Sequence, residues 1–262
     1  MKLSISNIGW NAKQDRQVYE LMHTNGFSGL EIAPTRIFPE TPYDKLKEAE
    51  FWAQNLKKEY GFSVPSMQSI WYGRQEKIFG TAEEFNFLID YTKKSIDFAA
   101  AINCKNLVFG CPRNRSTLEG KNPEAGVRFF KIIGDYAADK GTVIGMEANP
   151  TIYNTNYIND TKAALKLIEQ VDSKGFKLNL DIGTMVQNQE NAQIIKGNVG
   201  LINHVHVSEP GLRPIENRKI HQEIMDILVS EGYQKYVSIE MGKVEDILVL
   251  EDVMIYVKDV FK

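Results

Sequence analysis

The feature that most constrains the fold is a regular alternation of short β-branched or apolar runs with longer amphipathic segments. The runs are "KLSIS", "GLEIA", "SVPSMQS", "NLVFG", "VIGMEA", "KLNLDI", "HVHVS" and "YVSIEM". Between them, apolar residues recur at helical spacing, as in "TAEEFNFLIDYTKKSIDFAAA". Strands that alternate with helices of about 10–20 residues predict βαβ units and a parallel sheet.

Eight such units in 262 residues predict an α/β fold, a closed (β/α)₈ TIM barrel that forms a single domain over residues 1–262. The structural alternative is a doubly wound open sheet. That fold would normally carry a G-x-G-x-x-G turn after the first strand, and "SNIGWNAKQD" has none. Helix starts are predicted at Thr81, which forms a capping box with Glu84, and at Asn122 followed by Pro123.

The charge balance and the absence of long apolar windows restrict the class of partner. With 31 Lys and Arg against 34 Asp and Glu, the net charge is -3 and does not favour nucleic acid. The start "MKLSISNIGW" has no signal-peptide core, and no window approaches the length of a membrane span. We therefore expect a cytoplasmic protein that acts on a small molecule, away from membranes. Whether it forms a homo-oligomer stays open.

Four polar residues fall where the last four predicted strands end. They are Glu147 in "VIGMEA", Asp181 in "KLNLDI", His206 in "HVHVS" and Glu240 in "YVSIEM". Taken singly, each carboxylate could cap a helix or join a surface ion pair, and His206 could be a core histidine. Together at one mouth of a barrel the three carboxylates would repel one another, and one divalent cation removes that penalty. Ligation by carboxylates and one imidazole suits Mn²⁺, Mg²⁺, Co²⁺ or Zn²⁺. His204, one layer deeper on the same face, would support His206.

Several further residues lie near the same predicted mouth and are candidates for substrate binding. An arginine there could hold a phosphate or stay solvated, an aromatic face could stack on a sugar ring or pack in the core, and an amide could orient a ligand or cap a segment. The candidates are Glu31, Gln68, Trp71, Arg113, Arg115, Asn149, Arg213 and His221.

The segments "GMEANP", "NLDIGT", "HVHVSEPGLRPI" and "VSIEM" resemble the xylose-isomerase-like barrel superfamily. Its members include ketose 3-epimerases, hydroxypyruvate isomerase and inosose dehydratase. The resemblance implies that Glu147, Asp181, His206 and Glu240 bind one divalent metal ion. It also implies a sugar or sugar phosphate substrate, whose proton next to a carbonyl is moved by Glu147 and Glu240 through a metal-stabilised enediolate.

This chain departs from the ketose 3-epimerases at three positions around the substrate. Where those enzymes often carry a histidine, an arginine and a second glutamate, it has Thr184, Leu212 and Tyr153. Two alternatives to an isomerase or epimerase therefore stay open: a dehydratase of a keto-polyol, and a barrel that binds a sugar without turnover. A DNA-repair endonuclease of the same superfamily is disfavoured, because four histidines are too few for its three-metal cluster.

Overall fold

The strands form one parallel sheet that curls into a barrel. The structure is a computed structural model that describes residues 1–117 and 124–262. The sheet runs in the order β2-β1-β7-β6-β5-β4-β3, and every pairing is parallel. Its strands are β1 (Lys2–Ser6), β2 (Gly29–Glu31), β3 (Leu107–Phe109), β4 (Ile144–Met146), β5 (Phe176–Asp181), β6 (Ile202–Val207) and β7 (Tyr236–Ile239).

The segment "SVPSMQS", residues 63–69, closes the barrel without forming a regular strand. Isolated parallel bridges join Ser63 to β2, and Met67 to both Ile32 and β3. The sequence predicted eight strands, and at this place that prediction was wrong in detail. Pro65 has no backbone N–H to donate to a ladder, and the segment ends at Ser69 with a positive φ of 54°. The TIM barrel fold is nevertheless confirmed, because this segment spans the gap between the two outermost strands.

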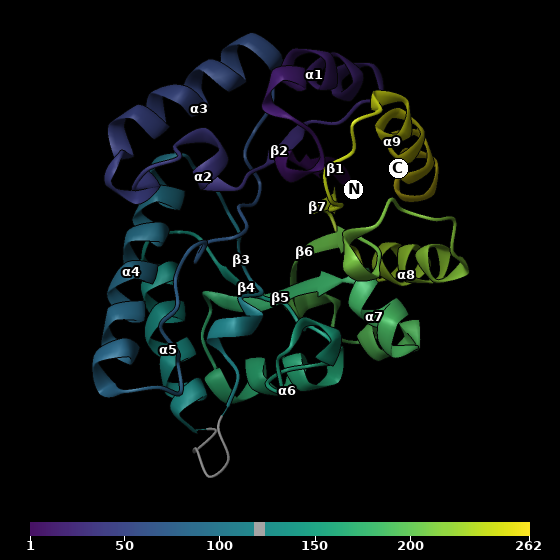
Figure 1. The fold of residues 1–262 in the computed structure, drawn as a ribbon. Coiled ribbons are helices and arrows are strands. Elements are labelled where there is room, and N and C mark those ends of the chain that lie inside the picture. Colours follow the sequence, from purple (N-terminus) through teal and green to yellow (C-terminus); the bar gives the residue numbers. More distant parts are fainter. Residues whose placement is uncertain (118–123) are drawn as a thin grey trace.

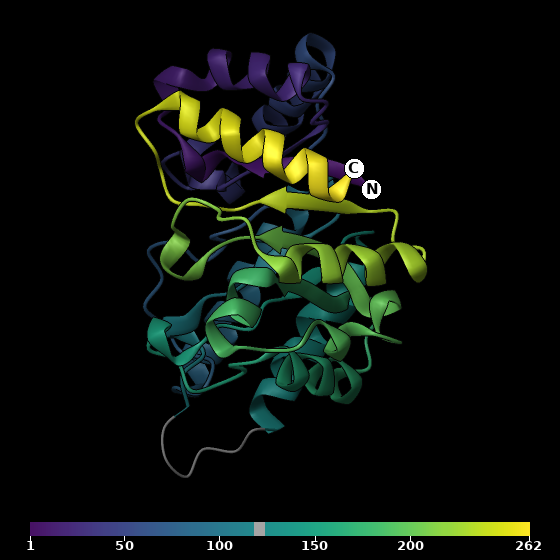
Figure 2. The ribbon, with the colours of Figure 1, turned by 90° about the vertical axis from the view of Figure 1, so that its right-hand side faces the viewer.

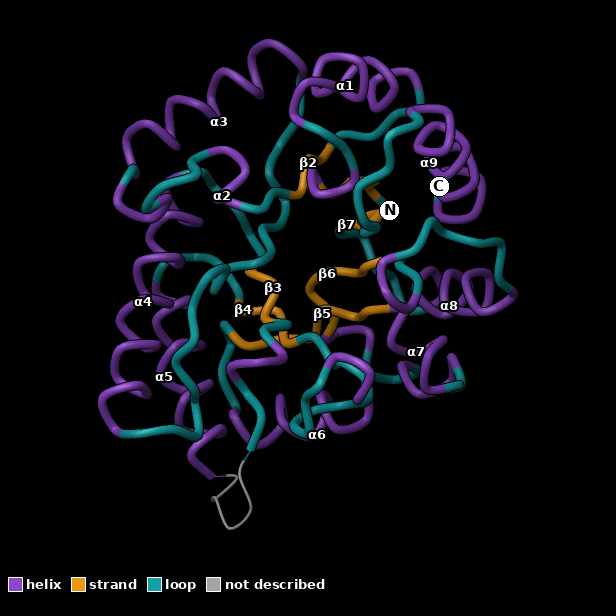
Figure 3. Tube along the Cα trace, viewed as in Figure 1, coloured by secondary structure: helices purple, strands orange, loops and turns teal. Residues whose placement is uncertain are grey.

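Helices surround the barrel on its outer side (Figures 1 and 3). They are α1 (Asp15–Thr24), α2 (Pro34–Ile37), α3 (Leu46–Tyr60), α4 (Ala82–Ala101), α5 (Glu124–Asp139), α6 (Thr161–Val171), α7 (Ile182–Asn188), α8 (Lys219–Ser230) and α9 (Ile247–Phe261). In Figure 2 the two chain ends lie side by side, with α9 beside β7. In the described residues, no helix is both long and apolar enough to cross a membrane.

The predicted capping box is present at the start of α4. The Thr81 side chain accepts from the backbone N–H of Glu84, and the Glu84 carboxylate accepts from the backbone N–H of Thr81. The other predicted helix start, at Asn122 and Pro123, lies outside the described residues. At the barrel strands, apolar side chains are buried on both faces, which explains why the strand runs read as nearly continuous apolar sequence.

Candidate metal centre

A cavity of about 560 Å³ opens at the carboxyl ends of the strands. Glu147 follows β4, Asp181 ends β5 and Glu240 follows β7, and all three line the cavity. Because the strands are parallel, residues that end them meet at one rim of the barrel. The sequence placed these carboxylates at a common mouth, and the structure brings them there.

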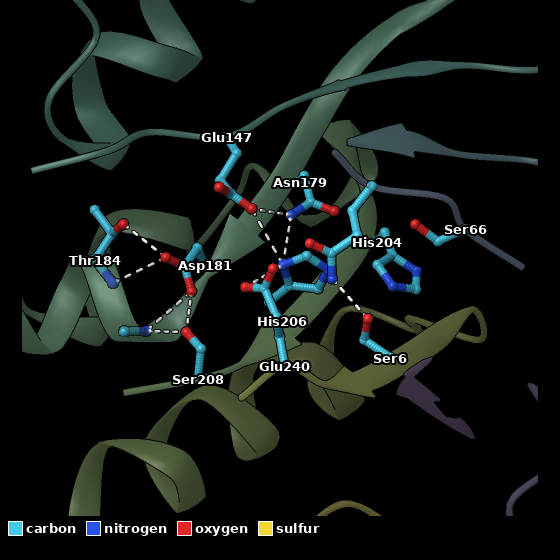
Figure 4. A network of polar contacts seen from close by, with 12 residues as sticks. Ser6, Ser66, Glu147, Asn179, Asp181, Thr184, His204, His206, Ser208 and Glu240 are labelled. Atoms are coloured by element: carbon cyan, nitrogen blue, oxygen red, sulfur yellow. Dashed lines mark hydrogen bonds and ion pairs between the residues drawn. The ribbon is translucent and has the colours of Figure 1, made fainter. Parts of the chain in front are cut away.

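His206, on β6, lies at the centre of the acidic cluster and is completely buried. Its Nδ1 atom is 3.1 Å from Glu147 Oε2 and 3.1 Å from Glu240 Oε2 (Figure 4). Glu147, His206 and Glu240 each offer a ligand atom within 4.8 Å of the others. Two carboxylates and one imidazole are a donor set that suits Mn²⁺, Co²⁺ or Zn²⁺, so these residues fit a divalent cation.

Asp181 stands beside this three-residue cluster but is engaged elsewhere. It is the register partner of His206 across β5 and β6. Its carboxylate caps α7 by accepting from the backbone N–H groups of Gly183 and Thr184, and it also contacts the hydroxyls of Ser208 and Thr184 (Figure 4). Of the four predicted ligands the structure therefore gathers three, with the fourth at the same rim in a helix-capping position.

The cluster concentrates negative charge in a place with little water. Burial raises the pKa of Asp181 to about 6, and the charge of Glu147 adds to the rise. Burial likewise raises the pKa of Glu240 to about 7, although the neighbouring His206 opposes the rise. Burial alone would lower the pKa of His206, but Glu240 and Glu31 hold it well above its usual value. Such a site needs positive charge, which a cation would supply.

Glu31 and His204 lie directly beneath His206, away from the cavity. Glu31 ends β2, is fully buried and does not line the cavity. Its Oε2 atom is 3.0 Å from His206 Nε2 and 2.9 Å from His204 Nε2. Burial alone would raise the pKa of Glu31, but His206 and His204 hold it well below its usual range. The sequence suggested that Glu31 contacts substrate, whereas its partners are these two histidines and Gln68.

Two further candidates for substrate contact instead support Glu147. Asn149 Nδ2 donates to Glu147 Oε1 at 2.9 Å, and its Oδ1 accepts from Arg115 Nη2 at 2.9 Å. Arg115 Nη1 donates to the Glu147 carbonyl at 2.7 Å. Arg115 is fully buried and does not line the cavity, and burial lowers its pKa to about 10. Asn149 does line the cavity, so it can touch a ligand as well as Glu147.

The remaining substrate candidates divide between the cavity and other places. Gln68, Trp71 and Arg113 line it, and Trp71 is fixed by donating from Nε1 to Thr92 Oγ1 at 2.9 Å. Arg213 is exposed and does not line the cavity. His221 is buried on α8, where its Nδ1 lies 2.8 Å from the Tyr256 hydroxyl of α9, and burial lowers its pKa to about 4.

The three departures from the ketose 3-epimerase pattern have defined places. Tyr153 and Leu212 line the cavity, and the Tyr153 hydroxyl accepts the backbone N–H of Gly211 at 2.9 Å. The Thr184 hydroxyl lies 2.7 Å from Asp181 Oδ2 and 2.8 Å from the Ala148 carbonyl, where it helps to hold Asp181. A phenol and an aliphatic side chain thus replace charged groups on the cavity wall.

Sequence reasoning missed several polar residues of the site, among them Asn179 and Glu209. Asn179 Nδ2 donates to Glu147 Oε2 at 3.0 Å and lies 3.3 Å from His206 Nδ1. Glu209 is buried in the cavity wall and forms a two-contact ion pair with Arg218, at 2.6 and 2.7 Å. Asn179 could have been found, because it precedes Asp181 by two residues in a strand and must share its face. No local pattern marks Glu209.

The parallel strands and the acidic and histidine side chains at their carboxyl ends are the arrangement of a TIM-barrel protein whose functional residues gather at one rim. The family model described as "Xylose isomerase-like TIM barrel" matches residues 19–254. The chain belongs to this family. A search of curated proteins finds no match.

Solved structures share the fold at low sequence identity. A 3-keto-D-glucoside 4-epimerase from E. coli is 19% identical, with a TM-score of 0.77 and 99% of each chain covered. The D-psicose 3-epimerase from Clostridium cellulolyticum H10, solved with D-tagatose, is 16% identical, with a TM-score of 0.77 and full coverage of both chains. The IolI protein with a bound zinc atom is 18% identical at a TM-score of 0.71, over 99% of this chain and 96% of that one.

Proposed function

We propose that the protein is a divalent-metal-dependent isomerase or epimerase that acts on a sugar or a sugar phosphate. The observation that carries the proposal is the buried cluster of Glu147, His206 and Glu240 at the cavity of about 560 Å³. The fold is shared with enzymes named as sugar epimerases, which supports a sugar as substrate, and with a zinc-bound protein, which supports a divalent metal ion.

In this proposal Glu147, His206 and Glu240 hold the cation, and Asp181 joins them as the fourth ligand. When bound, a divalent ion supplies positive charge to the carbonyl and neighbouring hydroxyl oxygens of a sugar, which stabilises an enediolate. Asn149 and Asn179 each donate to a different oxygen of Glu147, at 2.9 and 3.0 Å, and so fix the plane of that carboxylate.

Glu147 and Glu240 are placed to move the proton. They follow β4 and β7, both line the cavity, and Nδ1 of His206 lies between their carboxylates. One carboxylate can take the proton from a carbon next to the carbonyl while the other returns a proton to the opposite face, which gives epimerisation. A pKa of about 7 suits Glu240 to both accepting and donating near neutral pH.

The test combines proton exchange with matched glutamate variants. The protein, loaded in turn with Mn²⁺, Mg²⁺, Co²⁺ or Zn²⁺, is incubated in D₂O with a panel of ketoses and their phosphates. We expect solvent deuterium in one recovered sugar. Glu147→Gln and Glu240→Gln should each lower the exchange rate by about a thousandfold with the fold intact, whereas Glu59→Gln, exposed on α3, should exchange at the wild-type rate.

Other outcomes contradict the proposal in distinguishable ways. Net loss of water with a new enone absorbance would identify a dehydratase. Bound metal and tight sugar binding without exchange of any proton would identify a sugar-binding barrel. Wild-type exchange rates in either variant would remove that glutamate from the proton-transfer role.

A further inference from the structure

Glu31 contacts the face of His206 that points away from the cavity. The His206 ring has Nδ1 toward Glu147 and Glu240, and Nε2 at 3.0 Å from Glu31 Oε2. Glu31 and His206 are both fully buried, so solvent does not compete for this contact. The ring is therefore held between acidic side chains on two sides, one pair at the cavity and one carboxylate beneath it.

The contact decides which ring nitrogen can bind a metal. An ionised carboxylate only accepts hydrogen bonds, whereas a neutral imidazole carries one N–H and one lone pair. With the proton on Nε2 and directed at Glu31, the lone pair is on Nδ1 and faces the carboxylates of the cluster. With the proton on Nδ1, two lone-pair-bearing groups, Nε2 and Glu31, would face each other at 3.0 Å in a buried place.

We propose that Glu31 is a positioning residue for the metal centre, whose carboxylate keeps the His206 proton on Nε2 and so makes Nδ1 the ligand atom. The inference rests on the proposed function only in taking Glu147, His206 and Glu240 as the residues that hold the cation. Metal-ligating histidines commonly donate their second N–H to such a carboxylate, which fixes the ring and makes it a stronger donor.

Contacts from other elements hold Glu31 in place. Gln68 Nε2, from the segment that closes the barrel, lies 3.2 Å from Glu31 Oε1 and donates to Ser6 Oγ of β1 at 2.6 Å. His204 Nε2 lies 2.9 Å from Glu31 Oε2. Oε1 thus accepts from the Gln68 amide and Oε2 faces a ring nitrogen of each histidine, so a glutamine at this position would have to turn an NH₂ group toward one of these partners. The charge and the shape of the carboxylate are both needed.

The first experiment measures Zn²⁺ affinity by competition with a chromophoric chelator. Glu31→Gln should raise the Zn²⁺ Kd by about 10- to 100-fold. The matched control is Asp97→Asn, which removes a carboxylate outside the cavity that accepts from the Tyr136 hydroxyl and pairs with Lys140. The control should stay within about threefold of wild type, because loss of one distant, screened charge has a small effect compared with loss of ring orientation. A Kd for Glu31→Gln within threefold of wild type would overturn the proposal.

The second experiment does not depend on a variant that folds. In zinc-loaded wild-type protein labelled with ¹⁵N-histidine, the four histidines give a spectrum simple enough to assign. We expect His206 to carry its proton on Nε2 and zinc on Nδ1. Zinc on Nε2, or a second equivalent of zinc held by Glu31, His204 and His206, overturns the positioning role, as does the absence of bound zinc.

The two proposals can fail separately. If zinc binds with the expected nitrogen and Glu31→Gln weakens it, but no sugar exchanges a proton, the function is wrong and the role of Glu31 stands. If sugars exchange and Glu31→Gln binds zinc as wild type does, the function stands and the role of Glu31 is wrong.

Discussion

Replacing Arg115 by methionine tests whether this arginine supports the structure or binds the substrate. The sequence suggested that Arg115 holds a phosphate or carboxylate of the ligand. In the structure the side chain is fully buried, with Nη1 at 2.7 Å from the Glu147 carbonyl and Nη2 at 2.9 Å from Asn149 Oδ1. The guanidinium therefore supports the backbone and the amide that position Glu147.

The size of the effect follows from the acceptors that lose this donor. Arg115 also reaches the carbonyls of Phe109 and Ile158, but these accept the backbone N–H groups of Glu147 and Asn149 as well. Methionine therefore affects chiefly two acceptors, at about 1–3 kcal/mol each for a buried group left unpaired. Removing a charge from a buried place offsets part of this loss. We expect the free energy of unfolding to fall by about 3 kcal/mol, which lowers Tm by roughly 6–12 °C.

The assay is urea unfolding followed by circular dichroism, with calorimetric titration of inorganic phosphate and a ketose phosphate alongside. Arg113→Met is the matched control, since Arg113 is exposed and lines the cavity. It should unfold like wild type, within about 0.5 kcal/mol. The reasoning is refuted if Arg115→Met keeps wild-type stability and loses only phosphate binding.

Two further predictions concern proton release and close packing. Burial raises the pKa of Glu240 to about 7 and that of Asp181 to about 6, so each carboxyl must lose its proton before it binds a cation. The apparent Kd for Mn²⁺ should therefore fall as the pH rises from 6 to 8. Deprotonation of Glu240 alone accounts for about a tenfold fall. Titration calorimetry at several pH values measures this, and a constant Kd would contradict it. Gly175→Ala should destabilise by about 3 kcal/mol in thermal unfolding, since its Cβ would lie 2.5 Å from the backbone nitrogen of Ala138. Gly200→Ala, where nothing lies within 4 Å, is the control and should stay near wild type.

The position of the candidate site along the barrel was predictable from the sequence. Glu147, Asp181, His206 and Glu240 each follow a run of apolar residues, and parallel strands bring such positions to one rim. Strand alternation also placed His204 on the face of His206, one layer deeper, where it contacts Glu31. These predictions depend only on the alternation of side chains along a strand and on the parallel direction of the strands, and both can be inferred from short stretches of sequence.

The direction in which each side chain points was not predictable in the same way. Glu31 ends a strand and Arg115 lies in the loop after one, yet both turn into the protein, toward His206 and toward the Glu147 carbonyl. His221 lies at the start of α8 as expected but meets Tyr256 of α9. Each outcome depends on acceptors or hydroxyls supplied by elements far away in sequence, and a linear pattern does not contain them. The same applies to Asp181, which caps α7 although its strand position suggests a ligand.

The irregular strand connects the closure of the barrel with the proposed metal centre. Pro65 has no N–H to donate, yet the backbone of segment 63–69 still bonds to both sides, with the Gln68 N–H donating to the Ile32 carbonyl and the Val108 N–H to the Met67 carbonyl. Polar side chains inside the barrel bridge the same gap: Gln68 reaches Ser6 and Glu31, and Asn106 Nδ2 donates to Ser66 Oγ at 3.0 Å. Because Glu31 is also the partner of His206, the contacts that close the barrel hold the ring of a proposed ligand. A loosened segment would therefore weaken metal binding without a change in any of the proposed ligands.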